Sequence, residues 1–439
     1  MCIKQIIFAS YLKPLKSDGM KPWKVIIAVF IFNTTLSFAQ VVPLAKIYNA
    51  SVQAYKNKDY KTFLALTQKL DTLRPFHPSY TYNLAGAYAL NNESDKALAT
   101  LKRLVMMNNT AAFETDDDFI SLRETDGYKV IIALKEAQGK EVATSKSVVT
   151  LSEKELHPEG LIYLPKSKIW LASSIRKRKI VAFDIKSGKC TDWLKDDKTL
   201  AVFGMKADAK EQFLWVSTAA MPEMENFKQT LVGKSEVLKI DIKTKKVVNA
   251  YTFNGTHVFG DLIVDKNGIV YVSDSQKPIV YKIENEVMEQ FLSFENEGFN
   301  LQGLAFNDKQ DKLFLADYLK GIVVIDITSK TKTWLDFPEG TTAKGIDGLV
   351  FYKNSLIAIQ NGAKPIRVTQ FQLNEEQNKI SSFKILDNNR PEFDEPALSV
   401  VFGSKIYFFA NSPWKAYDKN GVLDLTKVSN PILFSCKLD

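Results

Sequence analysis

One short signature occurs six times between Glu159 and Leu398, and its spacing constrains the fold more than any other feature of this sequence. Each copy has a residue of variable polarity, then a small residue, then an aliphatic one. The copies begin at residues 159, 203, 260, 302, 347 and 396, so successive copies lie 44, 57, 42, 45 and 49 residues apart. Repeats of this length that each hold several short strands are typical of radial β-repeats. The spacing predicts a mainly β fold, a six-bladed β-propeller.

The last blade indicates how the ring closes. From about residue 142 the sequence shows short strands of alternating polarity, separated by turns rich in Lys, Asp, Gly and Asn. The sixth blade has candidate strands at 398–402, 405–410 and 431–438, one strand fewer than a complete blade. The segment 147–152 precedes the first blade and belongs to no other. We therefore expect it to complete the sixth blade, which leaves no open sheet edge.

Residues 40–141 have a different pattern, with apolar and small residues at helical spacing. The segments 59–64 and 93–98 superimpose at a shift of 34 residues, with Pro at the turn between repeats, and resemble tetratricopeptide repeats. A degenerate closing helix pair follows at 118–128. Such a domain could hold a protein partner in its groove, or could serve as a cap on the propeller. We expect a small α-helical repeat domain at 40–141 and the propeller at 142–439.

The N-terminal region has the pattern of a secretory signal. Lys21 and Lys24 precede the apolar run 25–32, and Ser37 and Ala39 are small residues at the positions that a signal peptidase reads. A membrane anchor needs about 20 apolar residues, far more than this run has. We expect residues 1–39 to be the signal region, with translation from Met20 and cleavage after Ala39. The mature chain would be exported, periplasmic or secreted, with no transmembrane segment.

Charge and cysteine content exclude some classes of protein. The 58 basic and 50 acidic residues give a net charge of +8, and removal of residues 1–39 would reduce it to +4. No long basic block with interleaved aromatic residues occurs, so nucleic acid is a poor candidate partner. Cys190 and Cys436 would remain after cleavage, in strands that should not be neighbours. We expect two free thiols.

Two sets of residues should meet at one mouth of the propeller. Inner strands start together around the axis, so the first residues of the signature should form a ring there: Glu159, Phe203, Gly260, Gln302, Asp347 and Pro396. The second set ends the next strands and is polar throughout: Ser173, Thr218, Asp274, Asp317, Asn361 and Asn411. The long loops 219–235 and 411–430 should overhang this mouth. Converging carboxylates and amides are hard oxygen ligands of the kind that calcium takes. The alternative is that they only cap a water-filled channel.

This layout is similar to a known family. Glu159-Gly160 at the start of the first blade and Asp347-Gly348 at the start of a late blade resemble the senescence marker protein/gluconolactonase (regucalcin-like) family over residues 147–439. The resemblance implies a divalent metal at the axis, held by a Glu, two Asn and an Asp, which polarises the carbonyl of a lactone or related ester. Glu159 matches the Glu. Asp347 matches the Asp, which the resemblance also implicates in proton transfer.

Two positions depart from the family's pattern. Gln302 stands where one Asn is expected, and Gly260 stands where the other is expected, although the following Asp261 matches. The expected metal ligands are therefore Glu159, Gln302, Asp347 and Asp261. The resemblance implies calcium as the metal, with manganese or zinc as alternatives.

Two histidines precede ring positions and should lie at the same mouth. His157 is two residues before Glu159, and His257 is three residues before Gly260. With Asp347 they are the candidate catalytic residues, because a His there could serve as general base. The alternative is that they are rim histidines without a role. The sequence has no nucleophile elbow, phosphate loop, paired-His zinc motif or paired-Cys metal motif.

These observations lead to one functional hypothesis and one alternative. The first is an exported metal-dependent hydrolase of lactones or related esters, whose small-molecule substrate binds at the propeller axis. The alternative is a non-catalytic ligand- or protein-binding propeller of the cell envelope with a degraded metal site. The two departures at Gly260 and Gln302 favour the second hypothesis, and the matches at Glu159 and Asp347 favour the first.

Overall fold

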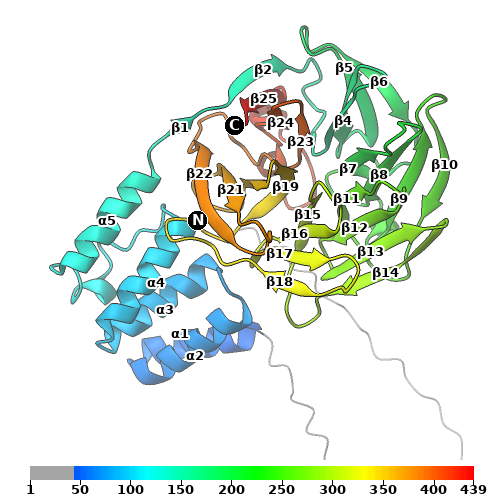
Figure 1. Ribbon diagram of the computed structural model, residues 1–439. Helices are drawn as coiled ribbons and strands as arrows, with labels where there is room; N and C mark the ends of the chain where they lie inside the picture. The colour runs from blue at the N-terminus through cyan, green and yellow to red at the C-terminus, as the bar shows by residue number, and fades with distance from the viewer. Residues whose placement is uncertain (1–43) are drawn as a thin grey trace, which may run out of the picture. The chain divides into compact units, whose positions relative to one another are not determined.

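The computed structural model describes residues 44–439 (Figure 1). The predicted signal region, with its start at Met20 and its cleavage site after Ala39, lies outside the described residues. Within 44–439, five α-helices precede a ring of six antiparallel sheets, and the six-bladed ring is as the sequence predicts. The predicted closing helix pair at 118–128 is wrong: a single 3-10 turn at Asp117–Phe119 precedes one helix, which begins at Asp126. No helix in this part of the chain is long and apolar enough to cross a membrane.

The helical region begins and ends its helices with recognisable signals. Asp59 caps the second helix, accepting a hydrogen bond from Thr62 N at 3.1 Å, and Thr125 caps the fifth in the same way. Pro78 occupies the first turn of the third helix, where its missing N–H costs nothing. The helices are α1 (Leu44–Lys56), α2 (Tyr60–Leu73), α3 (Pro78–Leu90), α4 (Ser94–Met107) and α5 (Asp126–Gln138). α1 and α3 start 34 residues apart, as do α2 and α4, and the resemblance to tetratricopeptide repeats stays a prediction.

Each of the six sheets is one blade, and its innermost strand contains all or part of a copy of the signature or directly follows one. Blade one has β3 (Leu161–Leu164), β4 (Ile169–Ser174), β5 (Lys179–Phe183) and β6 (Cys190–Lys195). Blade two has β7 (Ala201–Ala207), β8 (Phe213–Ala219), β9 (Ser235–Asp241) and β10 (Lys246–Tyr251). Blade three has β11 (Phe259–Val264), β12 (Val270–Asp274), β13 (Ile279–Glu284) and β14 (Val287–Ser293).

Blades four to six complete the ring. Blade four has β15 (Leu301–Phe306), β16 (Lys312–Asp317), β17 (Gly321–Asp326) and β18 (Lys332–Trp334). Blade five has β19 (Ile346–Tyr352), β20 (Ser355–Gln360), β21 (Arg367–Leu373) and β22 (Ile380–Asn388). Blade six has β23 (Ser399–Phe402), β24 (Lys405–Phe409) and β25 (Ile432–Lys437). Each inner strand contacts the inner strand of the next blade, and β23 contacts β3.

The ring closes through a strand that comes before the first blade. β2 (Lys146–Thr150) pairs antiparallel with β25, with Val149 opposite Leu433, and supplies the fourth strand of blade six. This confirms the predicted donation. A second addition was not predicted: β1 (Val142–Ala143) pairs with β22 as a fifth strand of blade five. Two residues are too few to show an alternating pattern in the sequence.

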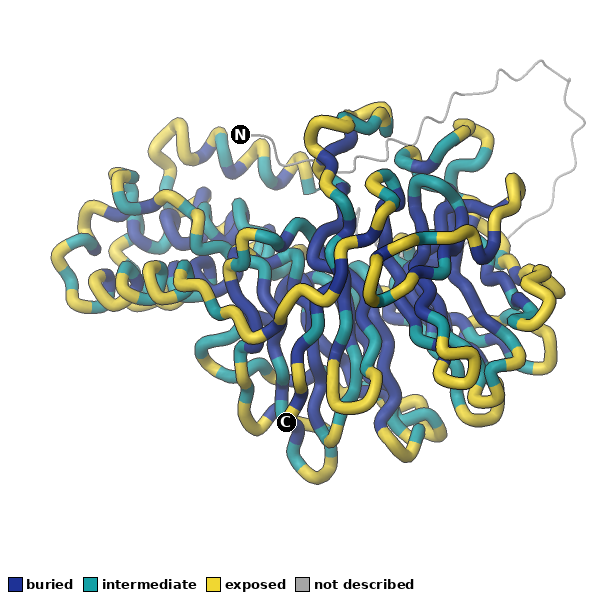
Figure 2. The backbone as a smooth tube through the Cα atoms, turned by 90° about the horizontal axis from the view of Figure 1, so that it is seen from above, coloured by how far each residue is buried: buried dark blue, intermediate teal, exposed yellow. Residues whose placement is uncertain are grey.

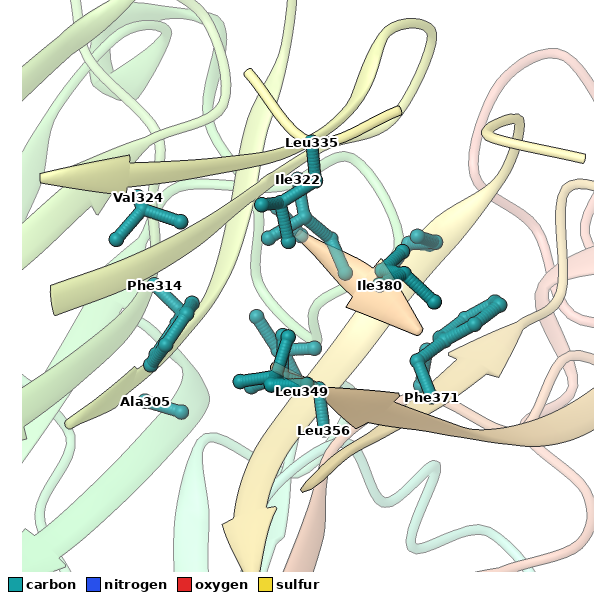
Figure 3. Packing of buried hydrophobic residues seen from close by; sticks show 13 residues of the cluster. Ala305, Phe314, Ile322, Val324, Leu335, Leu349, Leu356, Phe371 and Ile380 are labelled. Atoms are coloured by element: carbon teal, nitrogen blue, oxygen red, sulfur yellow. The ribbon is translucent and has the colours of Figure 1, made fainter. Parts of the chain in front are cut away.

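The hydrophobic core lies between neighbouring blades. Between blades four and five, Phe314 and Ile322 face Leu349, Leu356 and Phe371, and all five side chains are almost fully buried (Figure 3). Figure 2, turned by 90° from Figure 1, shows that most of the strands are buried and that the turns joining them are exposed, whereas outer strands such as β10 and β14 are exposed over much of their length. Cys190 in β6 of blade one and Cys436 in β25 of blade six are both free, as expected.

The small residue of the signature has a packing reason. A Cβ at Gly160 would overlap the carbonyl oxygen of Phe203, and one at Gly348 would overlap that of Ala397. A Cβ at Gly303 would lie 2.7 Å from the carbonyl oxygen of Asp347. Each glycine therefore lets one inner strand approach the backbone of the next blade's inner strand. The repeated small residue is what allows six strands to meet around so narrow an axis.

The helices are joined to blade five by hydrogen bonds. The backbones of Met107 and Asn109 exchange hydrogen bonds of 3.0 and 2.9 Å with Lys364, in the loop between β20 and β21. Arg367 is 2 % exposed, and its guanidinium donates to the Met106 carbonyl at 3.2 Å and to Gln138 Oε1 at 3.0 Å. A buried arginine is thus satisfied by groups from the helical region.

Candidate functional site

Glu159 immediately precedes β3 and is held by the overhanging loop that follows β24. Its Oε1 accepts hydrogen bonds from Ser412 Oγ at 2.9 Å and from Trp414 Nε1 at 2.5 Å. The side chain is 7 % exposed. Two donors on one oxygen fix the carboxylate, while its Oε2 has no hydrogen-bond partner among residues 44–439.

Asp347 lies in β19 of blade five, and a short hydrogen-bonded chain orients it. Asn361 Nδ2 donates to Asp347 Oδ2 at 2.5 Å, and the Tyr318 hydroxyl donates to Asn361 Oδ1 at 3.0 Å. Asp347 is surrounded by protein yet keeps partial contact with solvent, as expected for a group that lines a channel. Its Oδ1 makes no hydrogen bond within the described chain.

The two carboxyl groups disfavour each other's ionisation. Burial, and then the charge of Asp347, raise the pKa of Glu159 to about 8, although the hydrogen bonds from Trp414 and Ser412 oppose the shift. Burial likewise raises the pKa of Asp347 to about 7. The hydrogen bond from Asn361 opposes this shift, and the negative charges of Glu395 and Asp261 add to it. Without a bound cation, ionisation of both Glu159 and Asp347 is therefore unfavourable.

Asp261 lies deeper, on β11 of blade three. It is 2 % exposed; its Oδ2 accepts from Leu304 N at 3.3 Å, while its Oδ1 is buried without a hydrogen-bond partner among the described residues. Burial raises its pKa, against the charge of Lys206. A Cβ at Gly204 would lie 2.5 Å from Asp261 Oδ1, so the glycine of blade two makes the room that this carboxylate occupies.

The two departures from the family's pattern are spatially related. A Cβ at Gly260 would lie 2.7 Å from Ser275 Oγ and 3.6 Å from Gln302 Oε1. The longer Gln302 side chain therefore reaches toward the space that a side chain at 260 would occupy. Gln302 also donates to Asn300 Oδ1, and its Oε1 lies 3.5 Å from Ser275 Oγ. Gln302, which is longer than the expected Asn by one methylene, thus extends toward the space left by the absence of a side chain at Gly260.

The structure separates the two histidines. His157 is fully buried, has a backbone φ of +49°, and its Nδ1 lies 2.9 Å from the Tyr417 hydroxyl. Its Nε2 lies 4.0 Å from Glu159 Oε1 and has no hydrogen-bond partner among the described residues. Burial, and then the charge of Arg176, lower the pKa of His157 to about 3, so it is neutral. His257 lies at blade three, with Nδ1 2.7 Å from Asp274 Oδ2 and Nε2 3.1 Å from the Asn254 carbonyl.

Most of the second polar set supports loops. Asp317 accepts hydrogen bonds from the backbone amides of four residues in two loops, and Asp274 accepts from three backbone amides. Thr218 and Asn411 bond to backbone groups of the strands or loops beside them, and Ser173 Oγ accepts from Gly160 N at 2.6 Å. Asn361 is the member that hydrogen-bonds an axial carboxylate.

Several residues near the axis were not predicted as site residues. Ser412 and Trp414 belong to a loop whose overhang was expected, but nothing in the sequence says which of its side chains turns inward. Tyr318, which supports Asn361, also contacts Lys344, whose ammonium lies 5.5 Å from the ring centre. Lys344 does not belong to the carboxylate site: burial, and then the charge of Arg74 at the end of α2, lower its pKa to about 8.

The donor set fits a divalent metal only in part. Glu159, Asp347 and the Gln302 amide offer hard oxygens at the axis, and the unpartnered Asp261 Oδ1 adds an acceptor. However, the described residues contain no group of three or more His, Cys, Asp or Glu side chains placed to hold a metal ion together. A cation here would rest on two carboxylates, an amide and water.

The chain is similar in fold to several propellers of known structure. No family model and no curated protein sequence matches it. The PQQ-bound aldose sugar dehydrogenase from Streptomyces coelicolor superposes with a TM-score of 0.48 and 15% identity, over 68% of this chain and 98% of that chain. Virginiamycin B lyase from Staphylococcus aureus superposes with a TM-score of 0.45 and 12% identity, over 67% of this chain and 99% of that chain. A putative oxidoreductase (glucose dehydrogenase) from Thermus thermophilus superposes with a TM-score of 0.45 and 14% identity, over 66% of this chain and 99% of that chain. Function must therefore be argued from the site.

Proposed function

We propose that this propeller is a hydrolase of lactones or related esters, with a divalent cation held between Glu159 and Asp347. The observation that carries the proposal is the pair of carboxyl groups at the axis, whose pKa values are both raised and which lack a compensating positive charge. The resemblance to the gluconolactonase family supports calcium as the cation, with manganese or zinc as alternatives. The predicted export of the chain belongs to the same proposal.

The protein side chains have distinct roles in this scheme. When bound, a divalent cation polarises a carbonyl oxygen as a Lewis acid. Ser412 and Trp414 hold Glu159 in place through its Oε1, and Asn361 does the same for Asp347 through Oδ2. Asp347 Oδ1 remains available at a solvent-accessible position. It would take a proton from the water that attacks the carbonyl carbon and return it to the alkoxide released when the ester C–O bond breaks.

The histidines have secondary places in the scheme. His157 is a poor proton acceptor, because its pKa of about 3 lies far below the pKa of about 8 of Glu159, whose Oε1 is 4.0 Å from the Nε2 of His157. His257 is also a poor candidate because both of its ring nitrogens face oxygen atoms of the protein. We therefore assign proton transfer to Asp347 first.

The test combines binding and turnover on the purified protein. Calcium, manganese or zinc should raise the melting temperature of the wild type, because a ligand that binds only the folded state stabilises it. A panel of lactones and aryl esters should show hydrolysis with metal and little with a chelator. Asp347→Asn should abolish the thermal response to metal and lower turnover about 100-fold or more. Asp308→Asn, at an exposed position away from this mouth, is the matched control and should behave as wild type.

Two results would count against the proposal. If metals raise the melting temperature but no substrate is turned over, the propeller is a metal-dependent binding protein. If metals change neither stability nor activity, the non-catalytic binding propeller with a degraded metal site is the better description.

A further inference from the structure

The propeller has a second hollow, at the opposite end of the axis from Glu159 and Asp347. A cavity of about 400 Å³ is lined by residues of five inner strands, β7, β11, β15, β19 and β23, that stand two or more positions after the first residue of each signature copy; these strands surround the centre of the ring in Figure 1. The signature residues stand at or near the starts of these same strands. Since a strand rises roughly 3.3 Å per residue, Gly260 and Val264 are about 13 Å apart along β11. The hollow therefore opens at the other end of the axis from Glu159 and Asp347, and it adjoins Asp261, whose Oδ2 accepts from the backbone N–H of Leu304 in the lining.

The walls of this hollow combine apolar side chains with a few polar ones. Ile263, Leu304, Phe306, Val350 and Val400 contribute to its lining, from four different blades. Its volume falls within the range of about 300–1,000 Å³ typical of small-molecule pockets. The hollow can therefore receive the apolar body of a small ligand.

Two hydrogen-bond donors line the same hollow without a partner in the described chain. Ser399 Oγ, in a residue that is 3 % exposed, has no hydrogen bond. The Lys206 ammonium makes no hydrogen bond or ion pair with any described residue, whereas Lys179, on a strand of blade one, pairs with both Glu153 and Asp192. A buried hydroxyl without a partner is costly, so an acceptor from outside the protein would be favoured there.

The acidic groups nearby do not neutralise Lys206 directly. Asp308 lines the cavity but is exposed at its rim, and Asp261 influences Lys206 without approaching within ion-pair distance. The charge that best complements an apolar pocket with a free ammonium and a free hydroxyl is a carboxylate.

We propose that this hollow binds a small apolar monocarboxylate, such as a medium-chain fatty acid. Its carboxylate accepts hydrogen bonds from Lys206 and Ser399, and its hydrocarbon chain lies against the ends of the inner strands. This ligand site is independent of the hydrolase proposal and requires no metal.

Calorimetric titration of the purified protein with octanoate and with 1-octanol tests the proposal. The two probes have the same chain length and differ in charge. Octanoate should bind about 10- to 100-fold more tightly than 1-octanol, the range expected for a charged hydrogen bond. Lys206→Met should reduce the affinity for octanoate to that for 1-octanol. Lys266→Met, an exposed lysine in the turn after β11 at the same end of the propeller, should leave the octanoate affinity unchanged.

A second variant and a metal control complete the test. Ser399→Ala should weaken octanoate binding by a smaller factor, which provides a second test if Lys206→Met does not fold. The octanoate affinity should be equal with calcium and with a chelator. The proposal is wrong if neither probe binds, if both bind equally, or if Lys206→Met binds octanoate as wild type does.

Discussion

At the scale of single residues, the propeller axis holds two carboxyl groups, surrounded by protein, whose ionisation lowers the stability of the folded state. Glu159 lies just before the inner strand of blade one and Asp347 lies in the inner strand of blade five, and the pKa of each carboxyl group is raised above its usual value. Neighbouring hydrogen bonds orient both groups, yet none brings a positive charge. Such pairs are frequent at functional sites, where stability is sacrificed for chemistry.

This arrangement predicts how stability depends on pH. An acid whose pKa is raised on folding binds more protons in the folded than in the unfolded state between its two pKa values, so the free energy of unfolding falls as pH rises through that window. For Glu159 the window runs from 4.5 to about 8, and for Asp347 from 3.8 to about 7. In the presence of a chelator, the free energy of unfolding from urea titrations should fall between about pH 5 and pH 8.

The variant Asp347→Asn tests whether these two carboxyl groups cause the decrease in the free energy of unfolding with pH. Asp347→Asn removes one raised pKa and lowers the other, so its stability should vary less with pH and exceed that of wild type at pH 8. Asp317→Asn is the control, because its carboxylate accepts four backbone amides. It should be destabilised throughout this range and retain the decline. A decline that persists in Asp347→Asn would place its origin elsewhere.

The sequence located this pair of carboxylates but not their surroundings. Glu159 and Asp347 were identifiable because a periodic signature put both at the starts of inner strands. Trp414, Ser412 and Tyr318 were not, because they come from loops whose conformation depends on tertiary contacts and not on a repeated pattern. Asp274 and Asp317 look like site residues in the sequence, whereas in the structure their carboxylates are occupied by loop amides.

At the scale of elements, the inner strands depend on glycine for close approach. The substitution Gly348→Ala would force a Cβ onto the Ala397 carbonyl, which is backbone of the next blade and cannot rotate away. We expect it to cost about 1–3 kcal/mol in the free energy of unfolding. Urea denaturation measures this value directly.

The same substitution at a helical glycine provides the comparison. A Cβ at Gly86 in α3 would meet, at 3.2 Å, the end of the Asp118 side chain, which can move. Because alanine is the better helix former, Gly86→Ala should be neutral or stabilising by up to about 1 kcal/mol. Equal losses in the two variants would mean that the narrow axis is not the reason for the small residue.

The donated strand β2 offers a test with adjacent valines. Val149 is 8 % exposed and packs between blades six and one, whereas Val148 is 37 % exposed. Val149→Ala should lower the free energy of unfolding by about 2 kcal/mol, from lost burial and the cavity left behind. Val148→Ala should stay within about 0.5 kcal/mol of wild type. If Val149→Ala were equally mild, ring closure through β2 would contribute little to stability.

Elements differ in how far the sequence determines them. Helices α2 to α4 and strand β2 follow from apolar spacing, caps and the count of strands per blade. β1 could not be predicted, because its two residues form a strand only where β22 offers a partner. The cavity lined by the inner strands was also missed, since alternating apolar residues look the same whether they pack or leave a hollow.

At the scale of the whole molecule, the helical region and the propeller belong to one compact unit over the described residues 44–439. Their connection includes the buried Arg367 of blade five, whose guanidinium bonds to Met106 O and Gln138 Oε1. Burial lowers the pKa of Arg367 to about 10, a sign of how completely it is removed from water. The two parts should therefore unfold together.

Arg367→Leu should uncouple them. The change leaves the Met106 carbonyl and the Gln138 amide oxygen without their donors at a buried junction, at a cost of about 1–3 kcal/mol for each unsatisfied group. Trp170, Trp193, Trp215, Trp334 and Trp414, the tryptophans of the described chain, all lie in the propeller. Tryptophan fluorescence therefore reports propeller unfolding, and circular dichroism at 222 nm mainly reports the helices. In urea the two transitions should coincide for wild type, and in Arg367→Leu the helical signal should be lost first.

The control acts at the same junction but at the surface. Lys102 of α4 forms an exposed ion pair with Glu339 of the propeller, and such pairs contribute at most about 1 kcal/mol. Lys102→Ala should leave the two transitions coincident. If Arg367→Leu also unfolds in one transition with unchanged stability, the buried arginine does not couple the two parts. The connection would then rest on the backbone contacts between Lys364 and the end of α4 and on the pairing of β1 with β22.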